Sequence, residues 1–203
     1  MSKRVLYLLA ATLAMAGCGQ VGSNPSKVRM GGPRGQMPGF PPLEIAAEGP
    51  HAELLARANM AMRDGNPDGA IQALEELVQK DPGNRYALLV LAQALQERGH
   101  ALAHGREART GYAHFQKSAR YMRQLKAAVP ELSGPEADLY SYALYNDACA
   151  EALYGSPDKA ISLLEEALRA GFPRPDEIDR DEDFKSLKDE PKFKAVLERL
   201  RPM

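Results

Sequence analysis

The chain has 203 residues, of which 44% are hydrophobic and 26% charged, and its formal net charge is -1. This composition is that of an ordinary globular protein, and it excludes the basic surplus that nucleic-acid binding requires. We therefore expect one main folded domain and no nucleic-acid partner.

The first 17 residues differ from the rest and are predicted to be an export signal. A short basic start precedes an apolar run over residues 5–15, and these 11 residues are too few for a membrane-spanning helix, which needs about 20. Ala16-Gly17-Cys18 resembles the lipobox of bacterial lipoproteins, in which the cysteine is acylated and becomes the mature N-terminus. The resemblance implies a lipidated Cys18, and Gly19 after it implies the periplasmic face of the outer membrane. An ordinary signal peptide with an incidental cysteine is the alternative.

Residues 18–50 are predicted to be a flexible tether. Gly and Pro recur throughout this stretch without a sustained apolar period. A tether of about 30 residues has an average reach near 30 Å, so the folded part can stand off the membrane. If Cys18 is acylated, Cys149 is left without a disulfide partner in the chain and is expected to be a small buried side chain.

A phrase of 12 residues occurs twice, at 65–76 and at 155–166, with Gly, Pro, Asp, Ala, Ile, Leu, Glu and Glu at matching offsets. The apolar spacing predicts one helix over Glu53–Arg63 and a second from Pro67 to about Lys80. Between them, Gly65 ends the first helix and Asn66 caps the second.

Small residues, Ala58 and Ala70, stand where these two helices would cross, with Leu74 on the second helix and Pro82 after it. Close packing of helices needs such short side chains at the crossing. The pattern resembles a tetratricopeptide repeat. The resemblance implies an all-α fold in which antiparallel helix pairs stack as a short right-handed solenoid.

The resemblance extends over residues 51–173 as about three helix pairs, of which the middle one is expanded. Its closing prolines, Pro82 and Pro130, are 48 residues apart, whereas the repeat has 34. A lengthened second helix or an added loop within His100–Arg109 would explain the difference. The third pair is expected to have Ser156 as the cap of its second helix and Gly171 at its end.

Residues 174–203 resemble the terminal segment that closes bacterial tetratricopeptide arrays. Asp183-Phe184 and Leu187 predict a short helix, and Pro191-x-Phe193 predicts another. Such a cap covers the apolar face that the last pair would otherwise expose.

The chain contains no nucleophile elbow, zinc-protease motif, dinucleotide fingerprint or paired-cysteine motif, so neither an enzyme nor a cofactor is expected. The alternative function is metal or small-ligand binding in the envelope by the insertion 100–114. Its candidate ligands are His100, His104 and His114, because His100 and His104 are four residues apart and could share a helix face.

Four acidic residues also have the spacing of an EF-hand calcium loop, but Phe184 occupies the position at which that loop needs Gly. They are Asp179, Asp181, Asp183 and Glu190.

The resemblance implies a groove lined by the first helix of each pair, which would bind a protein or an extended peptide. Tyr and Arg suit such a surface because they bury a large area and keep a polar tip. The expected function is that of a lipid-anchored adaptor without catalytic activity in the bacterial cell envelope. The implied groove residues are Asn59, Met62, Arg63, Tyr86, Gln93, Gln96, Glu97, Tyr142 and Tyr145.

Overall fold

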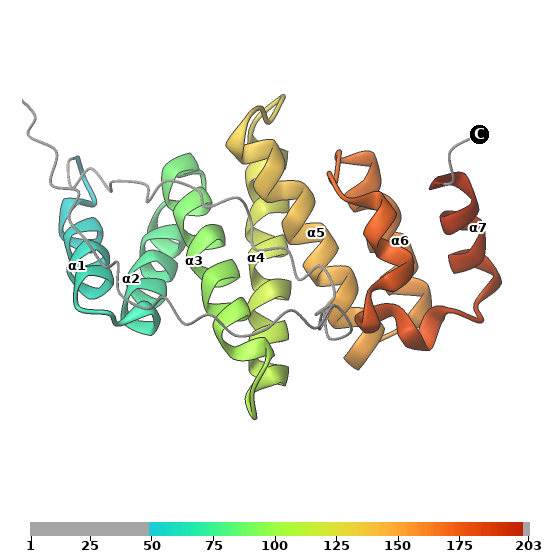
Figure 1. The fold of residues 1–203 in the computed structure, drawn as a ribbon. Helices are drawn as coiled ribbons and strands as arrows, with labels where there is room; N and C mark the ends of the chain where they lie inside the picture. The colour runs from blue at the N-terminus through green and yellow to red at the C-terminus, as the bar shows by residue number, and fades with distance from the viewer. Residues whose placement is uncertain (1–48, 201–203) are drawn as a thin grey trace, which may run out of the picture. The chain divides into compact units, whose positions relative to one another are not determined.

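The computed structural model describes residues 49–200, which all belong to one compact unit. They form α-helices joined by short turns, with two 3-10 helices near the end and no strand within this range (Figure 1). The predicted all-α helical-repeat fold is therefore confirmed. The elements are α1 (Ala52–Arg63), α2 (Pro67–Lys80), α3 (Arg85–Ala103), α4 (Ala108–Ala128), α5 (Pro135–Tyr154), α6 (Pro157–Arg169), η1 (Pro175–Arg180), η2 (Glu182–Leu187) and α7 (Pro191–Leu200).

Successive helices from α1 to α6 pack against each other as three pairs. α3 also packs against α5, which places first helices side by side. On the other side, α4 reaches both neighbouring second helices, because Lys117 pairs with Glu75 of α2 at 3.0 Å and Arg123 pairs with Glu166 of α6 at 3.2 Å. We call α1, α3 and α5 the first-helix layer, and α2, α4 and α6 the second-helix layer.

The residues predicted to cap or end helices do so in the structure, with one exception. Asn66 caps α2 by accepting a hydrogen bond from the Gly69 N–H at 2.9 Å, and Gly65 ends α1 with a φ of 67°. The exception is Ser156, whose side chain makes no capping hydrogen bond to α6. Its backbone N–H donates to Glu151 at 3.4 Å, so an acidic side chain of α5 contacts the N-terminal end of α6.

The expansion of the middle pair lies in both of its helices. α3 has 19 residues and α4 has 21, against 12 and 14 in the first pair, and only a short turn separates them. Gly99 lies inside α3, where a Cβ atom would come 2.4 Å from the Phe115 ring. A Cβ on Gly111 would come 2.8 Å from the carbonyl oxygen of Gly99. The two glycines therefore mark the crossing of α3 and α4.

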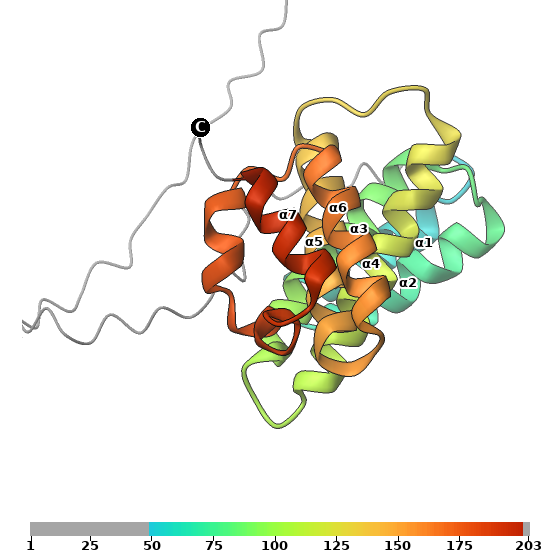
Figure 2. The ribbon, with the colours of Figure 1, turned by 90° about the vertical axis from the view of Figure 1, so that its right-hand side faces the viewer.

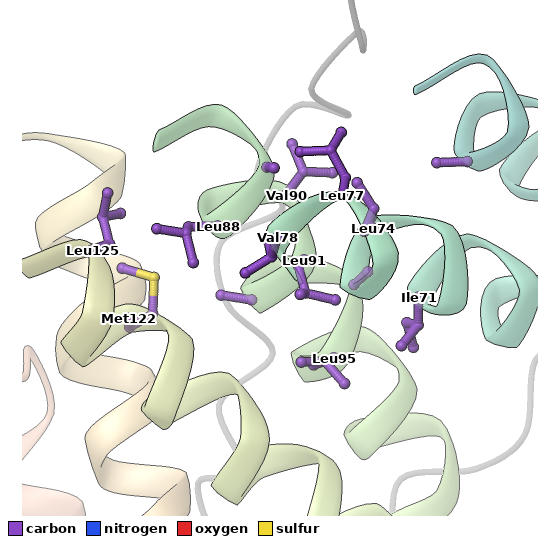
Figure 3. Packing of buried hydrophobic residues seen from close by; sticks show 14 of the residues in the cluster. Ile71, Leu74, Leu77, Val78, Leu88, Val90, Leu91, Leu95, Met122 and Leu125 are labelled. Atoms are coloured by element: carbon purple, nitrogen blue, oxygen red, sulfur yellow. The ribbon is translucent and has the colours of Figure 1, made fainter. Parts of the chain in front are cut away.

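The first pair, α3, α4 and the start of α5 share one apolar core (Figure 3). A second apolar cluster joins the start of α4, α5 and α6 to the C-terminal segment. No helix within residues 49–200 combines the length and the apolar character that a membrane span requires.

The C-terminal segment is a shortened fourth unit. α7 lies beside α6 and is tied to it by Lys192–Asp158 at 2.6 Å and by Arg199–Glu165 (Figure 2). Both pairs join residues 34 positions apart, which is one repeat length. α7 therefore occupies the second-helix position of a fourth unit, in which η1 and η2 stand in place of a first helix.

Candidate partner-binding surface

The residues predicted for the groove fall into an accessible group and a buried group. On α1, Met62 is 44% exposed and Arg63 is also exposed, while Asn59 is half-buried. On α3, Glu97 is exposed and Tyr86 is half-buried. The accessible group thus belongs to the first two helices of the first-helix layer.

Two further predicted residues, Gln93 and Gln96 of α3, are buried. The Gln93 amide donates to Glu97 at 3.1 Å, which holds that carboxylate close to its own helix. The Gln96 amide oxygen accepts a hydrogen bond from Asn146 of α5 at 2.6 Å. Gln96 therefore joins α3 to α5 and does not face an open surface.

Tyr142 and Tyr145 of α5 lie beneath the C-terminal segment, with exposures of 4% and 0%. Phe172 stacks on the Tyr145 ring at a centroid distance of 4.0 Å and an interplanar angle of 6°, and it meets Tyr142 edge-on at 5.4 Å. The Tyr145 hydroxyl donates to Asp181. The expectation that these tyrosines line an open groove is wrong for this arrangement, because the chain itself covers their face of α5.

Two of the four acids with calcium-loop spacing lie in this contact. Asp181 and Asp183 are buried, whereas Asp179 and Glu190 are exposed. Asp183 accepts a hydrogen bond from Tyr112 of α4 at 2.8 Å. The two buried carboxylates thus accept tyrosine hydroxyls, and the four acids do not converge as a loop.

With the buried Cys149 thiol, these two carboxylates form the one group of three possible metal ligands within residues 49–200. The thiol lies 4.0 Å from Asp181, and the Asp183 N–H donates to Asp181 at 3.0 Å. Burial raises the pKa of Tyr145 far above its usual range, and Cys149 and Asp181 raise it further, so its hydroxyl remains a donor. We interpret the cluster as the polar attachment of the C-terminal segment to α4 and α5.

None of the three candidate histidines belongs to that cluster within residues 49–200. His104 is the C-cap residue that follows α3, four positions after His100. The His100 ring packs edge-on against Phe115 at 4.9 Å. His114 lies on α4, where burial and the nearby Lys117 lower its pKa. Within residues 49–200, no group of three possible metal ligands includes a histidine.

Sequence reasoning missed the buried acids of α5. Asp147 pairs with Arg123 at 3.1 Å, and burial raises its pKa against the opposing effect of that guanidinium. Glu151 accepts hydrogen bonds from Lys159 at 2.6 Å and from Gln116 at 2.9 Å. The signal in the sequence is that these two acids lie in an otherwise apolar stretch. A buried acid requires partners, so the stretch indicates contacts with bases or amides of other helices.

The stacked pairs define this chain as an all-α helical-repeat protein. Residues 61–101, which span the end of α1, all of α2 and most of α3, match a family model described as tetratricopeptide repeat. This match supports a protein that contains a tetratricopeptide repeat. No curated protein and no solved structure matches it.

Proposed function

We propose that this protein is an adaptor of the bacterial cell envelope, held by a lipid on Cys18 at the periplasmic face of the outer membrane, and that it has no catalytic activity. It binds a protein or an extended peptide through the accessible residues of α1 and α3. The tetratricopeptide match carries the proposal, because this repeat is generally a scaffold for protein contacts. The signal-like start of the sequence supports the anchor, and Cys18 lies outside the described residues.

The surface that remains accessible is suited to a mixed contact. Met62 offers an exposed apolar side chain, and Arg63 beside it offers a cation. Glu97 on α3 supplies an acid, and half-buried Tyr86 supplies an aromatic ring with a polar tip. Such a set favours a partner with both apolar and charged groups.

Site-specific photo-crosslinking in cells tests the binding surface. A crosslinking side chain at Met62 is expected to capture a discrete partner, and the yield is expected to fall when Arg63→Ala is added. The matched control is the same crosslinker at Gln79, an exposed position of α2 in the second-helix layer. Identical adducts from both positions, or none from Met62, would remove the proposed surface.

Membrane fractionation tests the anchor separately. Cys18→Ser is expected to move the protein from the membrane fraction to the soluble fraction, because the acylated residue is lost. Cys149→Ala is the control, since Cys149 is buried in the helical unit. Retention of the Cys18→Ser protein in the membrane fraction would contradict lipid anchoring at this cysteine.

A further inference from the structure

A hollow of about 330 Å³ lies where α4 ends, α5 begins and α6 ends. The α4–α5 connection and the end of α6 are at the same end of the helices in Figure 1. Three apolar side chains form part of its wall, Leu132, Ala137 and Ala170. Its volume falls at the lower end of the range of about 300 to 1,000 Å³ that is usual for small-ligand sites. None of its residues belongs to the proposed groove.

The single acid in this hollow is already engaged. Glu166 accepts the Tyr140 hydroxyl at one oxygen, at 3.0 Å, and an N–H of Arg123 at the other, at 3.2 Å. Burial first, and Glu166 second, raise the pKa of Tyr140 to about 12, so this hydroxyl keeps its proton at neutral pH and donates a hydrogen bond. Both carboxylate oxygens of Glu166 are therefore occupied by donors.

Unlike Glu166, the two bases that line the hollow are not held in an ion pair within the described residues. Lys126 and Arg169 both line it, and neither takes part in an ion pair within the described part of the chain. The Lys126 ammonium donates to the carbonyl oxygen of Pro130 at 3.2 Å, which leaves it further N–H donors. The hollow thus combines apolar walls with two available cations.

We propose that this hollow binds a small amphiphilic anion, a carboxylate on a short apolar group. The carboxylate lies between Lys126 and Arg169, whose N–H groups supply charge-assisted hydrogen bonds. The apolar group contacts Leu132 and Ala137. The start of α5 favours an anion, whereas the ends of α4 and α6 both disfavour one, so the preference for an anion must come from the two bases.

Ligand-observed NMR with N-acetyl-leucine tests the site on the full chain purified in detergent. We expect millimolar binding that weakens about tenfold or more in Lys126→Gln/Arg169→Gln, because both charge-assisted contacts are lost. N-acetyl-leucinamide, which lacks the negative charge, is expected to bind about tenfold or more weakly to the unaltered chain. Lys188→Gln, an exposed base in the C-terminal segment, is the matched control and should leave binding unchanged.

Equal binding of the acid by the double variant and the unaltered chain would overturn the proposal, as would equal binding of the acid and the amide. Both altered side chains lie on the surface, and an unchanged melting temperature would show that the variant is folded. A comparison with the peptide Gly-Gly-Gly-Gly-Leu then distinguishes two sources of the ligand. Binding about tenfold tighter than that of N-acetyl-leucine identifies a polypeptide C-terminus, and equal or weaker peptide binding identifies a free small acid. Absence of binding by either acid at concentrations on the order of 10 mM would refute the site.

Discussion

Gly99 and Gly111 allow α3 and α4 to cross at short range. The atoms that a new Cβ on Gly111 would meet include the Ala103 N–H nitrogen at 2.7 Å and the Gly99 carbonyl oxygen at 2.8 Å. These are backbone atoms, so they cannot move aside as the end of a flexible side chain would.

We therefore expect Gly111→Ala to lower the free energy of unfolding by about 2 kcal/mol or more, because the helices must separate. Gly105→Ala is the matched control in the adjacent turn, since a Cβ there would have its nearest contact at 3.8 Å. That change should stay within about 0.5 kcal/mol. Urea denaturation measures both, and equal stability of the two variants would contradict the crossing.

Tyr145 is a second residue at which a single atom, the hydroxyl oxygen, is expected to affect stability. Tyr145→Phe removes the hydroxyl donor from buried Asp181 while keeping the ring that stacks on Phe172. We expect a loss of about 1 to 3 kcal/mol in the free energy of unfolding, because the carboxylate is left short of a partner. The exposed Tyr154 gives a comparison, and Tyr154→Phe should change stability little in the same thermal melt. A smaller effect at Tyr145 than at Tyr154 would refute this role.

At the scale of elements, α5 is the helix on which the others depend. It packs against α3, α4, α6 and η2, and its buried acids pair with side chains of α4 and α6. Glu151 in particular joins α4 through Gln116 and α6 through Lys159. One side chain thus links three helices of the last two pairs.

This link predicts a dependence of stability on pH. Burial raises the pKa of Glu151, but hydrogen bonds from Lys159, the Ser156 N–H and Gln116 outweigh it and lower the pKa below the usual value of 4.5. A lowered pKa means that the folded state favours the ionised form, so the stabilisation is present above pH 4.5 and is lost as the pH falls through the lower value.

Glu151→Gln should therefore reduce the free energy of unfolding by about 1 to 3 kcal/mol at pH 7. The difference from the unaltered chain should shrink as the pH falls below 4.5, and denaturant titrations at several pH values measure it. Glu198→Gln, an exposed change on α7, is the control. A difference that grows on acidification would contradict a lowered pKa for Glu151.

At the scale of the whole folded unit, the helices differ in the number of their neighbours. α1 packs mainly on α2, whereas α5 is covered on several sides. In stacked repeats, stability depends on the interfaces between neighbours, so a terminal helix opens more readily than a central one.

Hydrogen exchange should show this difference directly. We expect backbone amides in the middle of α5 to exchange at least about tenfold more slowly than those in the middle of α1. Residues 142–150 and 55–60 are suitable segments, because both lie inside helices and away from their ends. Mass spectrometry of peptides from these segments measures the rates, and equal protection would show that the unit opens as a whole.

Much of this fold is predictable from local patterns. Apolar spacing predicts α1 and α2, Asn66 and Gly65 give the boundary between them, and the repeated phrase indicates stacked pairs. The burial of Tyr145 was not predictable in the same way. It depends on contact with Phe172 and Asp181, and nothing in the period of α5 specifies which later segment covers it. The same holds for the α4–α5–α6 hollow, because its bases come from separate helices.

The C-terminal segment covers α5. This limits the length of any ligand that binds to the first-helix layer. Of the three first helices, α1 and α3 keep accessible groove residues, and α5 does not. An α-helix with its side chains is about 10 to 12 Å wide, so α1 and α3, which both pack against α2, present a strip roughly 20 Å across. At about 3.3 Å per extended residue, such a strip can contact roughly six residues of a partner. We therefore expect the proposed adaptor to bind a short linear motif.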